Sequence, residues 1–214
     1  IIGRSHAFDL NVNLYSKTSR TEFKSVGEIY SVLFKPKTGV SLNLGIDFGK
    51  TIRMELGYDS ISYEITDNAF AFETTEFKVA NSKLAILART DSGLYTRIGY
   101  SKTNYILTSF DIDPATSSIT PEVNAYELTQ YELGIGLITR GGKVMAITEL
   151  TKFHIPKQSV GGFEFTGRGT DIGVKIEMSG GIGVHFNYTN STINYTGESI
   201  VDEKKYGIYQ RTQF

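Results

Sequence analysis

Residues 171–188 read DIGVKIEMSGGIGVHFNY, and this stretch decides the fold class. Apolar side chains occupy every second position on both sides of Ser179-Gly180-Gly181, and polar or small residues fill the positions between them. Successive residues of a strand point to opposite faces, so the pattern predicts two amphipathic strands. Glycine supplies the positive φ that a tight hairpin turn requires. The stretch is therefore predicted to be a β-hairpin with one apolar face and one polar face.

The same period of two recurs along the chain. It is clear in 8–14, 40–48, 52–58, 172–178 and 182–188, and fainter in 77–90, 94–106, 125–139 and 203–214. Segment 143–155 is strand-like with an ambiguous phase, because Val144, Ala146 and Leu150 compete with Met145, Ile147 and Phe153. Glycine turns at 48–50, 91–93, 140–142 and 179–181 alternate with longer polar stretches at 17–38, 64–76, 107–124, 156–168 and 196–203. Short turns on one side and long loops on the other predict an up-and-down antiparallel meander.

The strand count follows from this pattern. Residues 1–214 are predicted to form a single all-β domain of about ten strands, with the first long loop at 17–38. An even number puts both termini on the side of the short turns. Residues 26–34 are also strand-like, either as an extension of a neighbour or as a hairpin, so eight or twelve strands stay open.

Composition excludes several functional classes. The 214 residues include no Cys, which excludes disulfides, thiol nucleophiles and Cys-ligated metals. The 22 basic and 23 acidic residues leave a net charge of -1, which argues against a nucleic-acid-binding surface. No apolar run approaches the ~18 residues of a transmembrane helix. The composition leaves open a membrane crossing made by strands.

The polar faces indicate which side of the sheet is wet. They carry glycine, serine, asparagine and isolated charges of both signs, whereas a solvated surface is usually rich in Lys, Glu and Thr. The glycines on these faces are Gly45, Gly57, Gly99, Gly134, Gly136, Gly173 and Gly183. Small residues there predict a crowded lumen, with the apolar faces turned outward to lipid. The alternative is a soluble β-barrel with the faces reversed, which would bind an apolar ligand inside.

Aromatic residues gather near the predicted strand ends, as in the interfacial girdles of transmembrane barrels. They are Phe8, Tyr15, Phe48, Tyr58, Phe77, Tyr95, Tyr105, Tyr126, Phe153, Tyr188, Tyr206 and Phe214. Tyr and Phe are also good strand formers, which is the alternative explanation for their number.

The last strand, Lys205–Phe214, ends the sequence in Phe. With the phrases LNLGIDFGK (42–50), MELGYD (54–59) and YELGIGL (131–137), the chain resembles bacterial outer-membrane β-barrel proteins of the small OmpA, OmpX and OmpW types. The resemblance implies a closed transmembrane barrel surrounded by outer-membrane lipid or lipopolysaccharide, with Phe214 as a signal for the barrel-assembly machinery. Thr212 and Gln210 depart from the family, which usually has apolar residues at these outward positions. Ile1-Ile2-Gly3 shows no signal-peptide features, so either the protein is cytosolic or a signal peptide has been removed. The resemblance to outer-membrane proteins implies an exported protein whose signal peptide has been removed.

The alternation also points a set of charged and polar side chains into the lumen. They are Asp9, Asp47, Arg53, Glu55, Arg97, Glu132, Lys175, Glu177, His185 and Arg211. Both signs occur in near balance, and an unpaired buried charge costs several kcal/mol. We therefore predict a salt-bridge network that plugs the barrel or leaves a narrow wet path. In the functional alternative, the same charges line a pore for small solutes or ions.

No catalytic residue, metal site or cofactor is predicted, and two enzyme alternatives stay open. Outer-membrane lipid A deacylases have a Ser two residues after their His, but here His185 is followed by Asn187, and the acid would be Glu198 or Glu203. The ordinary expectation for His185 is a lumenal residue paired with a carboxylate. Omptin-like proteolysis by His154 with Asp111 or Asp113 rests on fold analogy.

The leading expectation is thus a barrel without enzymatic activity, with a structural, adhesive or narrow-pore role. Any extracellular ligand is expected at the long loops 17–38, 64–76, 107–124 and 156–168, since loops on a rigid scaffold commonly carry recognition.

Overall fold

Eleven β-strands make up the part of the chain that the computed structural model describes, namely residues 7–25, 28–36, 38–65, 76–112, 119–160, 162–194 and 198–214. They are β1 (Ala7–Ser25), β2 (Glu28–Pro36), β3 (Thr38–Phe48), β4 (Ile52–Ile65), β5 (Glu76–Arg89), β6 (Leu94–Ile112), β7 (Ile119–Gly141), β8 (Val144–Val160), β9 (Phe163–Met178), β10 (Ile182–Asn194) and β11 (Glu198–Gln213). Over these ranges there is no helix of the length and apolarity that a membrane span requires.

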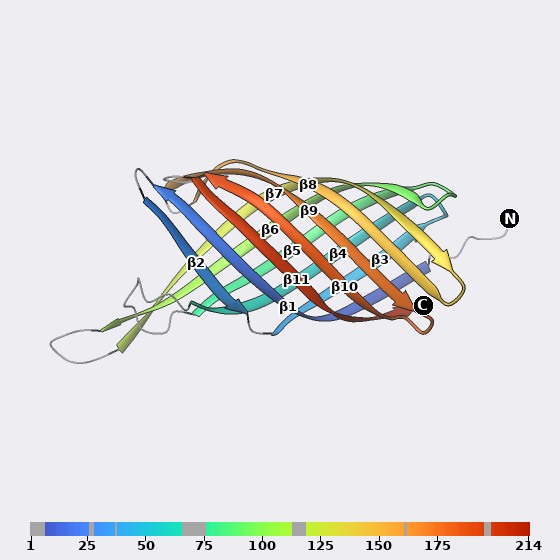
Figure 1. The fold of residues 1–214 in the computed structure, drawn as a ribbon, viewed down its shortest axis with the longest axis horizontal. Helices are drawn as coiled ribbons and strands as arrows, with labels where there is room; N and C mark the ends of the chain where they lie inside the picture. The colour runs from blue at the N-terminus through green and yellow to red at the C-terminus, as the bar shows by residue number, and fades with distance from the viewer. Residues whose placement is uncertain are drawn as a thin grey trace.

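The strands close into a barrel (Figure 1). Strands β3 to β11 pair antiparallel in sequence order, and β11 pairs with β1 to complete the circle. β2 and β3 share one position, because both pair with β1 on one side and with β4 on the other. The elements therefore form a closed antiparallel barrel of ten strands, which confirms the predicted fold class and excludes eight or twelve.

The register shows that the strands are steeply tilted. When the paired residues are followed once around the barrel from Asp9, the path returns to β1 at Thr21. This stagger is the shear that a closed barrel needs. Its consequence for the lumen is that residues of non-adjacent strands, such as Glu55 of β4 and Arg97 of β6, come to the same level.

The predicted glycine turns are confirmed. Gly49, Gly93, Gly142 and Gly180 have φ values of 72°, 88°, 59° and 100° in the turns after β3, β5, β7 and β9. These turns lie at the end of the barrel where the chain finishes (Figure 1). There Phe8 and Phe214 exchange backbone hydrogen bonds, Phe214 N to Phe8 O being 2.9 Å. The beginning of β1 and the end of β11 thus lie on the short-turn side, as expected.

The predicted long loops are wrong over most of their length. In 17–38, β1 continues to Ser25 and β2 follows; in 107–124, β6 runs to Ile112 and β7 begins at Ile119. In 156–168, β8 runs to Val160 and β9 begins at Phe163; β11 begins at Glu198, inside 196–203. Of 64–76, residues 66–75 lie outside the described part. Strand pairing continues where the apolar period stops, because strand ends outside the lipid can be polar on both faces.

Three prolines within the expected loops also lie in strands, namely Pro36 in β2, Pro121 in β7 and Pro156 in β8. The β7–β8 ladder ends at Tyr131↔His154, and the β8–β9 register shifts between Ile155 and Gln158. Proline has no N–H for a ladder and is found at such interruptions. Beyond the end of the ladder, the Gln158 side chain of β8 connects the two strands. Its Oε1 accepts the Thr129 N–H at 2.9 Å, and its Nε2 donates to the Thr129 carbonyl at 3.0 Å.

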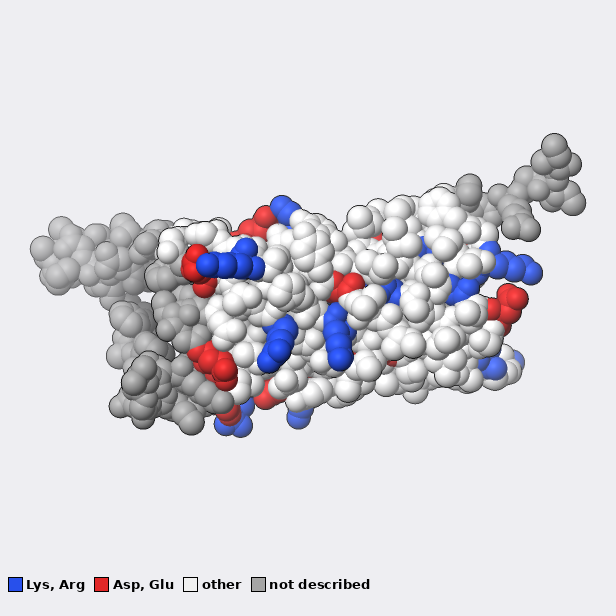
Figure 2. All heavy atoms as spheres, turned by 90° about the horizontal axis from the view of Figure 1, so that it is seen from above, with Lys and Arg blue, Asp and Glu red and all other residues white. Residues whose placement is uncertain are grey.

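The apolar faces point outward, as predicted. The exposed large hydrophobic residues include Val12, Leu42, Leu56, Ile86, Ile98, Leu133, Ile172, Ile176, Val184 and Ile208, whereas the buried residues include Asp9, Arg53, Ser101, Glu132 and Glu177. Figure 2 shows a broad outer surface with only scattered charges. The alternative of a soluble barrel with reversed faces is therefore wrong. In β8, whose phase was ambiguous, Val144 and Leu150 face outward and Ile147 and Phe153 line the lumen.

Candidate functional site in the barrel lumen

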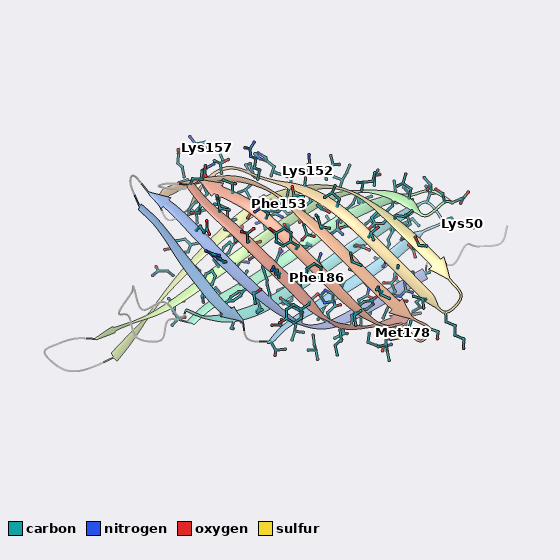
Figure 3. The ribbon with its side chains drawn as sticks, in the orientation of Figure 1. Lys50, Lys152, Phe153, Lys157, Met178 and Phe186 are labelled. Carbon is teal, nitrogen blue, oxygen red and sulfur yellow. The ribbon has the colours of Figure 1, made fainter. Side chains whose placement is uncertain are left out.

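A cavity of about 630 Å³ occupies the lumen. Its lining begins at Arg140 and Met145, beside the short turns, and continues to Thr21 and Ser199 near the opposite end. Figure 3 shows Lys152 and Met178 directed away from the barrel wall, whereas Phe153 lines this cavity. The cavity therefore extends along the length of the barrel interior.

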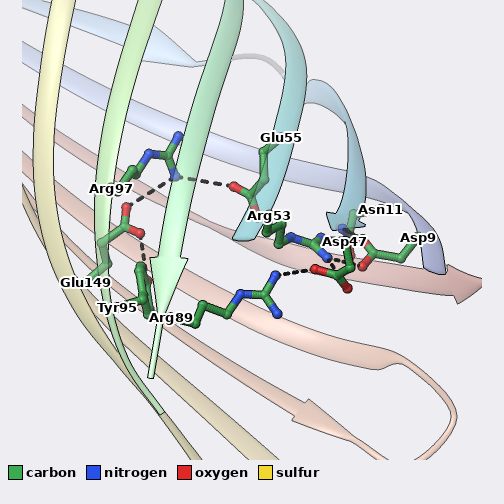
Figure 4. Close-up of polar contacts among 9 residues, drawn as sticks. All are labelled: Asp9, Asn11, Asp47, Arg53, Glu55, Arg89, Tyr95, Arg97 and Glu149. Atoms are coloured by element: carbon green, nitrogen blue, oxygen red, sulfur yellow. Dashed lines mark hydrogen bonds and ion pairs between the residues drawn. The ribbon is translucent and has the colours of Figure 1, made fainter. Parts of the chain in front are cut away.

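A buried ion pair stands at the short-turn end of the lumen (Figure 4). Arg53 of β4 makes a bidentate contact with Asp9 of β1, with Nη1–Oδ2 at 2.6 Å and Nη2–Oδ1 at 2.7 Å. Its Nε donates to Glu55 at 2.8 Å, and Asp47 lies at 3.3 Å from Nη1. Asp47 also accepts a 2.6 Å bond from Arg89. Charge-assisted and bidentate bonds of this kind fix geometry as well as charge.

Arg97 of β6 is the centre of a second group (Figure 4). Its Nη1 lies 3.5 Å from both Glu55 of β4 and Glu149 of β8, and its Nη2 lies 3.8 Å from Glu132 of β7. The Tyr95 hydroxyl donates to Glu149 at 2.7 Å. Since Glu55 touches both arginines, the two groups form one connected network along β1 to β8.

Smaller groups lie on the rest of the wall. Lys205 of β11 contacts Asp59 at 3.3 Å, and its Nζ sits 3.7 Å above the Tyr15 ring, a cation–π contact. Lys17 contacts Glu203 at 2.7 Å. Glu177 pairs with Arg211 and accepts a 3.3 Å bond from the Tyr209 hydroxyl.

The structure places all the predicted lumenal residues on the inner face of the barrel. Arg53, Glu55, Arg97, Glu132, Lys175, Glu177, His185 and Arg211 line the cavity, and Asp9 and Asp47 lie against the wall in contact with Arg53. Lys175 and His185 are cross-strand neighbours, and neither has a salt bridge among the described residues, although the charge of Lys175 acts on Glu55 at longer range. The expected carboxylate partner of His185 is therefore wrong: its ring is 6.4 Å from Tyr209, and its buried Nε2 has no hydrogen-bond partner there.

Sequence reasoning missed further members of the network. They are Lys17, Asp59, Lys83, Arg89, Glu149, Asp171, Glu203 and Lys205. Most lie an even number of residues from a predicted lumenal residue on the same strand, so the alternation itself could have found them. Lys17 was missed because residues 17–38 were expected to form a loop. Glu149 was missed because the inward face of segment 143–155 could not be assigned.

Several aromatic residues assigned to girdles lie inside the barrel instead. Tyr15 and Tyr95 are buried, and Phe77, Tyr105, Tyr126 and Phe153 line the cavity. Phe8, Phe48, Tyr58, Tyr206 and Phe214 are exposed on the outside, as a girdle requires. The correction has a simple cause, because an aromatic ring has no intrinsic preference for one face of an amphipathic strand.

The structure gives the contacts of two residues of the lipid A deacylase alternative. Asn187, at the position of the missing serine, donates to Asp171 at 3.0 Å, and Glu203 is held by Lys17. His154 is exposed on the outer face of β8. Asp113 and the side chain of Asp111 lie outside the described part. Within the described ranges, no cluster of three His, Asp or Glu residues is suited to a metal ion.

No family model and no curated protein sequence matches this chain. Among solved structures, the outer-membrane protease OmpT of Escherichia coli matches with a TM-score of 0.55 at 11% identity, covering 100% of this chain and 99% of that one. The chain has the fold of a bacterial outer-membrane β-barrel. Two other such barrels match with lower TM-scores. Ail of Yersinia pestis gives 0.46 at 9% identity, covering 98% and 100%, and OprG of Pseudomonas aeruginosa gives 0.42 at 12%, covering 99% and 97%.

Proposed function

We propose that this outer-membrane barrel is a narrow passive pore for small hydrophilic solutes. The observation that carries the proposal is the lumenal cavity of about 630 Å³, whose lining reaches from the short turns to the opposite end. A barrel of about eight strands is filled by its side chains and one of about sixteen leaves a wide channel, so ten strands suit a narrow path.

The arrangement of the ion pairs supports a pore more than a plug. Most of them join strands that are separated by only one other strand, as in Asp9–Arg53 (β1–β4), Glu55–Arg97 (β4–β6) and Glu177–Arg211 (β9–β11). Such contacts run along the curved wall. They narrow the lumen and leave its axis to water.

Planar-bilayer recording of the purified, folded protein tests the proposal. We expect small, discrete current steps in KCl. Replacing Arg97 and Glu149 together by Ser removes two large side chains that line the cavity and should increase the unit conductance. Lys152→Ser, on the exposed outer face of β8, is the matched control and should leave it unchanged. Folded protein that gives no current above that of the bare bilayer would refute the pore.

A further inference from the structure

The charged side chains of the lumen differ in how far they extend from the wall. The side chains of Asp9, Glu132 and Glu177 are only 3%, 7% and 8% exposed, each within a group of hydrogen bonds. The most exposed acid of the ion-paired network, Glu55, is held by two arginines. The negative charge of these residues is thus kept at the wall and compensated there.

Two lysines behave differently. Lys175 lines the cavity and is exposed, and it has no salt bridge among the described residues. The side chain of Lys83 is 35% exposed, and its ion pair with Glu132 is 3.9 Å long, at the limit for such a contact. Both ammonium groups therefore face the open part of the lumen.

Asp171 is a counterexample, because this lumenal acid has no salt bridge among the described residues and interacts with Lys83 only at longer range. It accepts hydrogen bonds from Asn187 at 3.0 Å and from Thr189 at 2.7 Å, both on the adjacent strand β10. These bonds hold the carboxylate against the wall, so its charge is less available to a passing ion than that of Lys175.

We propose that the pore prefers small inorganic anions over cations, and that Lys175 is the residue that determines this selectivity. The inference rests on the proposed function, since only a conducting barrel can select ions. Lysine rings and patches set anion preference in pores because they stabilise the permeating charge at its narrowest point. Lys175 of β9 and Glu55 of β4 stand on opposite sides of the ring of strands, and the charge of Lys175 still acts on the Glu55 carboxylate, so the lumen is narrow at this level.

The reversal potential in a KCl gradient measures the preference directly. The unmodified barrel should have a chloride-to-potassium permeability ratio above one. Lys175→Gln should lower the ratio by about an order of magnitude, because one charge at about 5 Å in water changes the permeabilities of chloride and of potassium about fourfold each, in opposite directions. Lys175→Glu should lower the ratio further. Lys152→Gln removes the same charge from the outer face and should leave the ratio unchanged.

A chemical variant makes the test independent of how well each substitution folds. Lys175→Cys introduces the only thiol of the chain, and it can be modified in the open channel. An aminoethyl thiosulfonate should restore the ratio and a sulfonatoethyl thiosulfonate should invert it. Current with a starting ratio at or below one would overturn the anion preference while leaving the pore intact. A permeability ratio that stays the same after every substitution and modification at position 175 would overturn the role of Lys175. The absence of current would refute the proposed function itself.

Discussion

At the residue scale, the lumen is built from glycines that make room for larger side chains on the next strand. Tyr95 lies directly opposite Gly136, and a Cβ added to this glycine would stand 2.3 Å from the ring. Tyr209 covers Gly183 in the same way, at 2.4 Å. These rings lie across the neighbouring strand and carry their hydroxyls to Glu149 and Glu177. Glycine opposite an aromatic ring is a known means of fixing register in curved sheets.

Gly136→Ala should therefore destabilise the barrel by about 1–3 kcal/mol, the usual cost of overpacking. The measurement is the urea midpoint of unfolding, read from the gel mobility of unheated samples. Gly141→Ala is the control, because a Cβ there has no heavy atom within 4 Å. Equal midpoints for the two variants would show that the ring moves aside without cost.

The sequence predicted the face of each charged residue better than its partner. Alternation is enough to turn Asp9 and Arg53 into the lumen. Their contact also requires that β1 and β4 bring them to one level, which depends on the register of the strand between them. Register is set by many cross-strand contacts together, so local periodicity contains little information about it.

At the element scale, periodicity predicted the central part of each strand and missed the polar extensions. β1 and β8 continue beyond their apolar alternation, as Lys17 to Ser25 and Pro156 to Val160. Apolar alternation arises only where one face meets lipid, whereas backbone pairing continues wherever two strands stay side by side. β8 is the most irregular of these strands, since its ladder with β7 ends before Pro156 and one side chain, Gln158, continues the connection.

Gln158→Ala tests whether this side chain holds β7 and β8 together beyond the ladder. Loss of the bond to the Thr129 N–H should speed hydrogen exchange at that amide about fivefold, the equivalent of roughly 1 kcal/mol. Exchange followed by mass spectrometry on β7 peptides gives the rate. Gln210→Ala removes an amide at the short-turn end, where Nε2 contacts the Gly180 carbonyl, and should leave Thr129 unaffected. An unchanged exchange rate at Thr129 in Gln158→Ala would mean that other contacts hold β7 and β8 together here.

At the scale of the whole molecule, the barrel is the reverse of a soluble domain, with apolar side chains outside and charges inside. A mean hydropathy of -0.17 fits this arrangement, because about half of each spanning strand faces the lumen. The periodicity was therefore enough to predict the fold class and about ten strands, with eight or twelve left open. It left the choice between plug and pore open, because that depends on how far the side chains reach across the lumen.

The central claim is that apolar faces meet lipid and polar faces meet lumenal water, and adjacent residues of β9 test it most directly. Lys175 lines the cavity, and Ile176 is 43% exposed on the outside. Each is replaced by Cys in the otherwise thiol-free chain, reconstituted in vesicles and treated with thiol reagents. We predict that Lys175→Cys reacts with a small water-soluble reagent and that Ile176→Cys reacts only with a lipid-soluble one. The opposite pattern, with position 176 open to water and position 175 open only to the lipid-soluble reagent, would contradict the account.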